Sequence, residues 1–254
     1  MSDITGWDFW RFCFRLDLRE KVRGVDYFRF YEFPTFYRKM ELATASSVLD
    51  LGCGHSLFPL FCAYKNPELR YTTLDIDPVA VAWQKRMKER LSPLPNLKLL
   101  EGDSTKMDFE ENTFDRVVNL GSIEHIPDQG DLSTAAEMGR VCRPGGLLVF
   151  SIPYSYEGCE QDTTDHWEGF ERRYDDAMLD ERIVKPSGCQ EVTRTYFGEP
   201  GFSFSEKWYP LPFPVKLPFR HFLPFASRRW LKTMSSEERQ KSCGVQVVLR
   251  KPES

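Results

Sequence analysis

The chain has 254 residues, of which 41% are hydrophobic and 28% are charged, so it can bury one large core and has the composition of a globular protein. Its formal net charge of −4 supplies no general positive field, which argues against a nucleic-acid partner. Seven scattered cysteines without a C-x-x-C pair argue for reduced thiols and against a structural zinc site. With no signal-peptide pattern and no run of roughly 18 apolar residues, we expect a soluble, cytoplasmic protein.

Short amphipathic helices are predicted in residues 1–45, over 7–20 and 34–44, because charged and aromatic residues are interleaved there. This segment holds 12 of the 36 aromatic residues of the chain. Two compatible interpretations are open. The rings pack the helices onto a sheet, or they form a lid over a pocket for an apolar or aromatic substrate.

Strands and helices alternate from residue 46 onward. Strands are predicted over 48–51, 70–75, 97–101, 114–120 and 147–152, with helices between them over 57–65, 78–91 and 132–142. Such alternation indicates an α/β fold in which helices cover both faces of a parallel sheet. Ligands of such sheets bind at the carboxyl ends of the strands, near the point where the strand order reverses.

The pattern loosens after residue 153. Residues 154–175 are predicted to form a polar loop, followed by a helix over 174–183 and strands over 191–197 and 244–250. The cofactor-binding core of a single domain is therefore expected to comprise 46–197 and 243–251, with a Pro/Phe-rich insertion over 198–242. Its stretch 207–236 carries six basic residues and no acidic one. It is interpreted as a pocket cap, a dimer contact, or, through 207–232, a peripheral contact with an anionic membrane.

The run VLDLGCG contains an acid ahead of a Gly-x-Gly turn, at Asp50, Gly52 and Gly54. Glycines let a backbone approach a ligand closely. A dinucleotide fingerprint would require a third glycine where Leu57 stands, and an anion before the turn suits a ligand with a positively charged end. Asp75, 23 residues after Gly52, ends the second strand, where an acid accepts hydrogen bonds from ribose hydroxyls.

Five motifs in order resemble the class I S-adenosylmethionine-dependent methyltransferases, of the Rossmann-like, small-molecule type: VLDLGCG, LDID, EGDSTKMDF, NTFDRVVNLGSIEHI and RVCRPGGLLVFSIP. The resemblance covers about residues 46–153 and, with the last two strands, some 60% of the chain. It implies a doubly wound, mostly parallel sheet of seven strands in the order 3-2-1-4-5-7-6, with the last strand antiparallel. It also implies S-adenosyl-L-methionine as cofactor.

The resemblance assigns cofactor contacts to ten residues. Beneath the methionine part it places the loop residues Asp50, Gly52, Cys53 and Gly54. Asp75 would hold the ribose, with Ile76 against the adenine. Asp103 would accept a hydrogen bond from the adenine amino group, with Ser104 beside it. Asn119 and Leu120 would pass near the methionine portion and the reacting sulfur.

Candidate catalytic residues follow the fourth strand. His125 is the first candidate for a general base or an orienting donor, together with Glu124, although an E-H pair here also has structural roles in the superfamily. His166 lies in the loop expected to border the acceptor. The segment resembles an E-x-x-E-H metal site, but its first glutamate is replaced by Gly121, so no metal is expected.

The sequence thus predicts an S-adenosylmethionine-dependent methyltransferase whose acceptor is a small, apolar or aromatic molecule, methylated on oxygen. Methylation of a protein or nucleic acid is the alternative within the enzyme class. A non-catalytic scaffold that binds S-adenosylmethionine is the alternative outside it.

Overall fold

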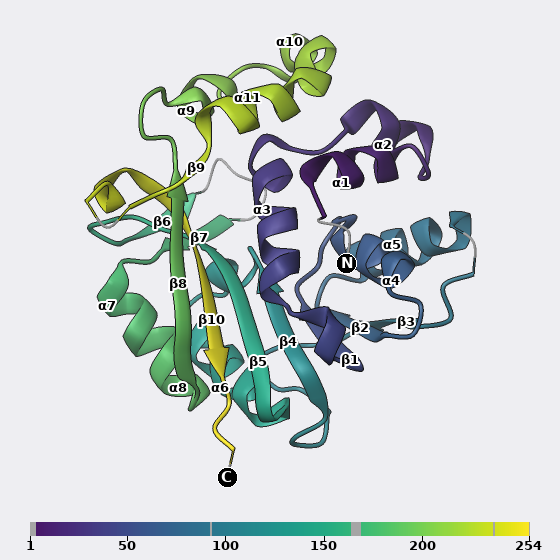
Figure 1. Cartoon of the computed structure of the whole chain (residues 1–254), viewed down its shortest axis with the longest axis vertical. Coiled ribbons are helices and arrows are strands. Elements are labelled where there is room, and N and C mark those ends of the chain that lie inside the picture. Colours follow the sequence, from purple (N-terminus) through teal and green to yellow (C-terminus); the bar gives the residue numbers. More distant parts are fainter. Residues whose placement is uncertain (1–3, 92, 164–168, 236, 254) are drawn as a thin grey trace.

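The main sheet is organised around β1 (Ser47–Leu51), whose five residues are all buried between two parallel neighbours. The computed structural model describes residues 4–91, 93–163, 169–235 and 237–253. Figure 1 shows the strands in the centre with helices on both sides. In their order across the sheet, the strands are β3 (Leu97–Glu101), β2 (Arg70–Asp75), β1, β4 (Phe114–Leu120), β5 (Cys142–Pro153), β10 (Ser242–Arg250), β8 (Gln190–Gly198) and β9 (Lys232–Thr233).

The first seven positions across this sheet follow the predicted order, and β10 is antiparallel to both of its neighbours. The predicted number of strands is wrong, because β9 adds an eighth at the edge. Its two residues pair with Gly198 and Phe197, and the N–H of Met234 donates to the carbonyl of Tyr196 at 2.8 Å. The returning chain thereby covers part of the open edge of β8, and two residues are too few to show hydrophobic periodicity.

Helices cover both faces of the sheet, as predicted. Val48 and Val118 belong to the hydrophobic cluster of one face, and Leu49 and Val117 to that of the other. On the first face lie α1 (Gly6–Cys13), α3 (Tyr27–Lys39), α4 (Phe58–Lys65) and α5 (Pro78–Arg90). On the second lie α6 (Gly130–Val141), α7 (Asp176–Leu179), the π-helical turn η3 (Asp180–Val184) and α8 (Lys185–Ser187).

The amino-terminal segment is helical, but the predicted helices over 7–20 and 34–44 are wrong in their limits. Asp17 accepts a hydrogen bond from the N–H of Glu20 and begins a separate helix, α2 (Leu18–Arg23). Asp26 likewise caps α3, which continues through Pro34. Side-chain caps start new helices because they satisfy backbone N–H groups that have no partner within the helix.

The prediction of a polar loop over 154–175 is also wrong, because β6 (Cys159–Thr163) and β7 (Gly169–Arg173) form an antiparallel hairpin. The hairpin is anchored by a charged residue. Arg172 is 1% exposed, lies 2.9 Å from a carboxylate oxygen of Asp131 on α6, and stacks over the ring of Phe170. An arginine at an inward position conceals the alternation by which a strand is usually predicted.

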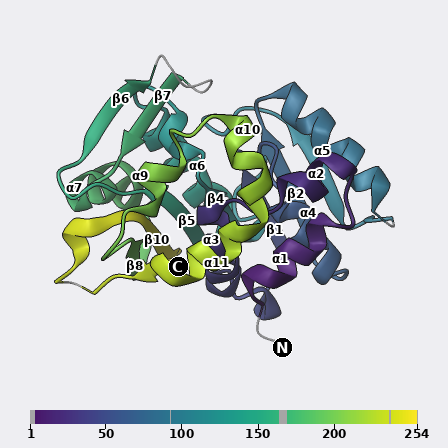
Figure 2. The same ribbon diagram turned by 90° about the horizontal axis from the view of Figure 1, so that it is seen from above.

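The insertion before the last strand folds into short helices next to the amino-terminal ones. α11 (Leu223–Trp230) packs on α3, and the 3₁₀ helix η4 (Leu217–Phe222) contacts α2. Figure 2 shows this layer from above, with α9 (Phe204–Trp208) and α10 (Phe213–Lys216) in the same segment. In the described part of the chain, no helix has the length and apolar character needed to cross a membrane.

Candidate functional site

A cavity of about 830 Å³ opens at the carboxyl ends of β1, β2 and β4, between the sheet, α2 and α3. Eight of the ten residues predicted to contact a cofactor line it: Gly52, Cys53, Gly54, Asp75, Ile76, Asp103, Ser104 and Leu120. Its volume lies in the range of small-molecule sites. Residues spread over 69 positions of the chain meet here because parallel strands place their carboxyl ends at one edge of the sheet.

The two glycines of the loop after β1 serve different purposes. Both have positive φ, 65° at Gly52 and 51° at Gly54, in a region that favours glycine. A Cβ at Gly52 would lie 2.2 Å from the Oγ of Ser122, so that glycine permits contact with the loop after β4. A Cβ at Gly54 would meet no atom of the described part of the chain within 4 Å. The backbone at Gly54 therefore faces open space that a ligand can occupy.

Asp75 connects the ends of β1 and β2. One carboxylate oxygen accepts a hydrogen bond from the N–H of Gly54 at 2.6 Å, and the other accepts one from the N–H of Asp77 at 2.9 Å. The side chain is buried yet lines the cavity. Since a carboxylate has about four acceptor positions, it retains capacity for the hydroxyls of a ribose.

Asp50 lies beneath the glycine loop and does not line the cavity. It is fully buried, and the hydroxyl of Tyr71 donates a hydrogen bond to it at 2.8 Å. Burial raises the pKa of Asp50 to about 7, against an ordinary value of 3.8. Its side chain thus ties β1 to β2 just ahead of the loop, and a nearby cation would favour its ionised form.

The remaining predicted cofactor residues divide between the cavity wall and its support. Asp103 is exposed at the wall, and one of its oxygens accepts hydrogen bonds from the N–H and hydroxyl of Thr105. Ile76 is also exposed there. Asn119 is buried outside the cavity, where its amide donates to the Oγ of Ser122 at 2.7 Å and its carbonyl accepts from the N–H of Ile123. It therefore shapes the loop that follows β4.

His125 lies in η2 (Ile123–His125) and lines the cavity. Its Nδ1 is 2.9 Å from the carbonyl oxygen of Phe170 in β7. A carbonyl only accepts hydrogen bonds, so Nδ1 carries the proton, and in the neutral ring Nε2 has the lone pair. The hairpin that was predicted as a loop thus determines which nitrogen can take up a proton.

Glu124 is buried beside this histidine, with one oxygen 3.9 Å from the Nε2 of His125. Burial raises the pKa of Glu124 to about 7, from an ordinary 4.5. Its second oxygen is buried and has no hydrogen-bond partner among the described residues. Buried acids with such pKa values occur at sites of proton transfer. His166 lies outside the described residues, and within those residues no group of three or more His, Cys, Asp or Glu side chains is placed to hold a metal ion.

The wall opposite the cofactor residues is charged. Five charged side chains line the cavity here: Glu20 and Arg23 of α2, Asp26 and Arg29 at the start of α3, and Arg220 of η4. None of these five residues was predicted individually as a site residue, although a lid was one interpretation of 1–45 and a pocket cap was one interpretation of 207–236. A pair of charges three residues apart in an aromatic helix, Arg29 and Glu32, was the available signal.

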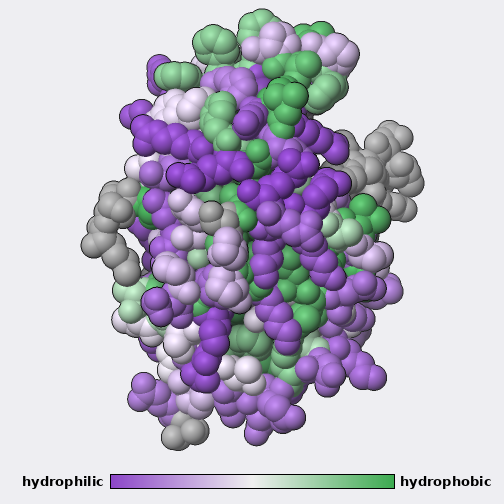
Figure 3. All heavy atoms as spheres, turned by 90° about the vertical axis from the view of Figure 1, so that its right-hand side faces the viewer, coloured by the Kyte–Doolittle hydropathy of each residue, from purple (hydrophilic) through white to green (hydrophobic). Residues whose placement is uncertain are grey.

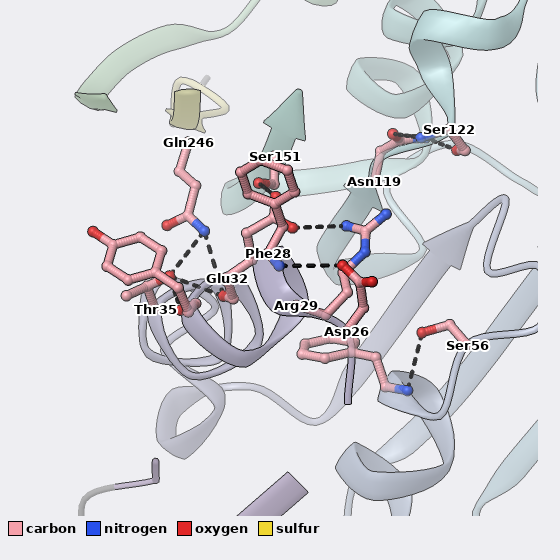
Figure 4. A network of polar contacts seen from close by, with 12 residues as sticks. Asp26, Phe28, Arg29, Glu32, Thr35, Ser56, Asn119, Ser122, Ser151 and Gln246 are labelled. Carbon is pink, nitrogen blue, oxygen red and sulfur yellow. Dashed lines mark hydrogen bonds and ion pairs between the residues drawn. The ribbon is translucent and has the colours of Figure 1, made fainter. Parts of the chain in front are cut away.

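Figure 4 shows how Arg29 is held. It donates to Glu32 at 3.1 Å, and the second carboxylate oxygen of Glu32 accepts a hydrogen bond from the hydroxyl of Ser151 on β5. Gln246 of β10 donates to the carbonyl of Glu32 and to the hydroxyl of Thr35. This network joins α3 to two strands, so the position of Arg29 in the cavity depends on the sheet.

Most amino-terminal aromatic side chains pack in the core instead of lining the cavity. Phe9 contacts Phe33, Phe58 and Phe61, with ring centroids 5.0, 5.8 and 3.9 Å away. Phe33 is the one aromatic side chain from the first 45 residues that lines the cavity within the described chain. Of the two interpretations of this segment, packing accounts for most of its rings, while the helices carrying them still form a wall.

Comparison with known proteins connects this site to a family. Residues 48–146 match the family model described as "Methyltransferase domain". The phthiotriol/phenolphthiotriol dimycocerosates methyltransferase of Mycobacterium leprae is 28% identical over 104 residues, which cover 41% of this chain and 36% of that protein. Demethylmenaquinone methyltransferase of Staphylococcus aureus is 39% identical over 62 residues, which cover 24% of this chain and 25% of that protein. The chain thus spans well under half the length of these curated relatives.

A solved structure extends the likeness to the fold. The [4+2]-cyclase SpnF superposes with a TM-score of 0.63 at 17% identity, covering 88% of this chain and 82% of that one. At this identity, the likeness shows a shared fold alone. A cyclase on this fold illustrates that the chemistry must be argued from the site itself.

Proposed function

Because residues 48–146 form a class I S-adenosylmethionine-dependent methyltransferase domain, with S-adenosylmethionine as its cofactor, we propose that the chain methylates a small molecule. The observation that carries this proposal is that one cavity joins the predicted cofactor residues to His125. Bound S-adenosylmethionine supplies the methyl group from its sulfonium. The residues of the chain then have to bind the cofactor and the acceptor, align them for methyl transfer, and exclude water.

Cofactor binding is assigned to the loops after β1, β2 and β3. Gly52 and Gly54 bring backbone to the methionine part, Asp75 accepts from the ribose hydroxyls, and Asp103 accepts from the adenine amino group. The open space at Gly54 and the remaining acceptor capacity of Asp75 support this assignment. Asp50 and Asn119 act from outside the cavity, because Asp50 bonds Tyr71 of β2 ahead of the first loop and Asn119 holds the loop after β4.

We propose an oxygen acceptor, with His125 as the general base. Transfer to a hydroxyl requires that its proton leave, and the Nε2 of the neutral ring provides a lone pair for it. The carbonyl of Phe170 holds the ring in this tautomer. Glu124 is near enough to stabilise the imidazolium that forms, because its ionised form attracts the positive ring.

The acceptor is proposed to combine an apolar body with a polar end. Val25, Phe33 and Ile126 supply apolar walls, whereas Arg23 and Arg220 supply positive charge. The two curated relatives are named for lipid-like acceptors, a dimycocerosate and a menaquinone precursor. This supports an acceptor of the same general character.

The test is transfer of a labelled methyl group from S-adenosylmethionine to small molecules in an extract of the source organism, followed by mass identification. In parallel, calorimetry measures the binding of S-adenosylmethionine and of S-adenosylhomocysteine. We expect binding of both and a labelled small-molecule product, with much weaker binding and less product for Asp75→Ala. Binding without any transfer favours the scaffold, and label in protein or nucleic acid favours the other enzyme alternative. Absence of binding contradicts the proposal.

A further inference from the structure

Large apolar side chains gather on the outside of the carboxy-terminal insertion. Phe213, Phe219, Phe222 and Phe225 each leave 54% or more of their surface exposed. Leu18 and Val22 of α2 are also exposed, and α2 contacts η4. Figure 3 shows hydrophobic side chains at the upper end of the molecule, where these elements lie. We call these six residues, together with Arg228 and Arg229, the basic aromatic face.

The local geometry explains why these rings point outward. η4 is a 3₁₀ helix with about three residues per turn, so Phe219 and Phe222 lie on one side and Arg220 and Leu223 on the other. Leu223 is buried with Trp208 and Leu231 in a small core of the insertion, and Arg220 lines the cavity. The exposed phenylalanines therefore do not form the buried core of the insertion. Exposed apolar groupings of this kind mark interaction surfaces.

Positive charge accompanies the apolar side chains. The stretch 207–236 has no acidic residue, although the whole chain is acidic with a formal charge of −4. The basic residues of this stretch are Lys207, Lys216, Arg220, Arg228, Arg229 and Lys232. Arg228 and Arg229 are exposed in the last turn of α11. The stretch that carries the exposed phenylalanines thus has a net positive charge within an acidic chain.

The same elements form a wall of the cavity. The Nε of Arg220 donates to the carbonyl of Arg23 at 2.7 Å, which ties η4 to α2, and both side chains line the cavity. Phe219 lies next to Arg220 in the chain and on the outer side of the same helix. A surface that covers the basic aromatic face would therefore lie beside the cavity.

We infer that the basic aromatic face docks on the surface of an anionic lipid bilayer. Phenylalanine side chains insert at the boundary between headgroups and acyl chains, while arginine and lysine are attracted to anionic headgroups. A second copy of the chain fits less well. A symmetric contact would bring Arg228 and Arg229 of both copies together, and like charges repel.

Docking in this position gives the cavity access to molecules dissolved in the bilayer. Taken with the proposed function, which this step requires, the acceptor is a membrane-dissolved molecule with an apolar body. The docking itself rests on the surface and does not depend on methyl transfer. Vesicle binding and cofactor binding therefore test the two proposals separately.

The experiment is flotation of the full chain with vesicles of phosphatidylcholine alone, or with about 30 mol % phosphatidylglycerol, which carries the negative charge. We expect the chain to float with the anionic vesicles and hardly at all with the neutral ones. Flotation with the anionic vesicles should be lost at high salt. Phe219→Ser with Phe222→Ser, and separately Arg228→Glu with Arg229→Glu, should each lower the recovered fraction about tenfold.

Matched controls make the same changes elsewhere. Lys85→Glu with Arg86→Glu alters an exposed basic pair of α5, and Val79→Ser with Val192→Ser alters exposed apolar residues. These variants should float like the parent chain. Thermal melting and affinity for S-adenosylhomocysteine confirm that each variant is folded. The inference would be overturned if the chain did not float, if it floated equally with neutral vesicles, or if the control variants lost as much flotation. It would also be overturned if light scattering showed a dimer that is lost with Phe219→Ser and Phe222→Ser.

Discussion

The Nδ1 of His125 lies 2.9 Å from the carbonyl oxygen of Phe170, which joins the loop after β4 to a hairpin 45 residues further along the chain. This contact selects the tautomer that leaves the lone pair on Nε2. It also holds the ring at the wall of the cavity. The proposed proton transfer therefore depends on two segments that are far apart in the sequence.

Replacing His125 with alanine should lower kcat by about 100-fold or more, because general bases contribute roughly that factor. The affinity for S-adenosylmethionine should stay within about threefold, since the cofactor residues lie in other loops. Steady-state kinetics and calorimetry measure the two quantities. His55→Ala is the comparator, because the His55 ring lies against Trp83 and is assigned no proton transfer. An unchanged kcat for His125→Ala would remove the assigned role.

Asp75→Ala should weaken binding of S-adenosylmethionine by about 100-fold. A carboxylate that accepts from ribose hydroxyls contributes roughly 1.5–3 kcal/mol for each hydrogen bond. The N–H of Gly54 also loses its acceptor in this variant. Asp75→Asn keeps one acceptor oxygen and should be intermediate, while Asp108→Ala, at an exposed position outside the cavity, should bind normally. Calorimetry that finds a change below threefold for Asp75→Ala would rule out the ribose contact.

Asp50 should make the unliganded protein less stable as the pH rises. The folded state holds the proton up to about pH 7, whereas the unfolded carboxyl releases it near 3.8. The folded state therefore binds more protons, and stability falls as the pH increases between these values. We therefore compare the free energy of unfolding of Asp50→Asn with that of the parent chain. The difference in favour of Asp50→Asn should be larger at pH 8 than at pH 4 by on the order of 3 kcal/mol.

Chemical denaturation at a series of pH values measures this difference. Tyr71→Phe removes the hydroxyl that donates to Asp50, so it should raise the pKa of Asp50 further and extend the decline to higher pH. Glu124 is present in both proteins and cancels in the comparison. Parallel curves for Asp50→Asn and the parent chain would show that Asp50 has an ordinary pKa.

Arg172→Met should destabilise the fold by about 3 kcal/mol, because removing one partner of a buried ion pair leaves Asp131 less well compensated. It should also lower kcat, since Arg172 donates to the carbonyl of Ile126 in the loop beside His125. The neighbouring Arg173 provides the control. Its pair with Glu171 is 49% exposed on the arginine side, so Arg173→Met should cost about 1 kcal/mol or less. Equal effects of the two substitutions would contradict the anchoring role.

The sequence by itself determined the sheet and predicted which residues meet at the proposed cofactor site. The alternation of strands and helices predicts a parallel sheet covered on both faces, and the resemblance to class I methyltransferases implies the strand order and that Gly52, Asp75 and Asp103 meet at one site. Both can be predicted because parallel strands bring their carboxyl ends to one edge of the sheet, whichever side chains lie between those ends. Local motifs, such as the Gly-x-Gly turn at Gly52 and Gly54, then locate the residues at those strand ends.

Only the tertiary structure decided the acceptor side. The hairpin β6–β7 is anchored by a buried arginine, which no hydrophobic pattern predicts, and its carbonyl at Phe170 orients His125. The charged wall comes from α2, α3 and η4, which meet across almost 200 residues. The amino-terminal rings point largely into the core because burial of apolar surface outweighs any preference for lining a cavity. Contacts between distant segments depend on packing, and packing is a property of the folded chain.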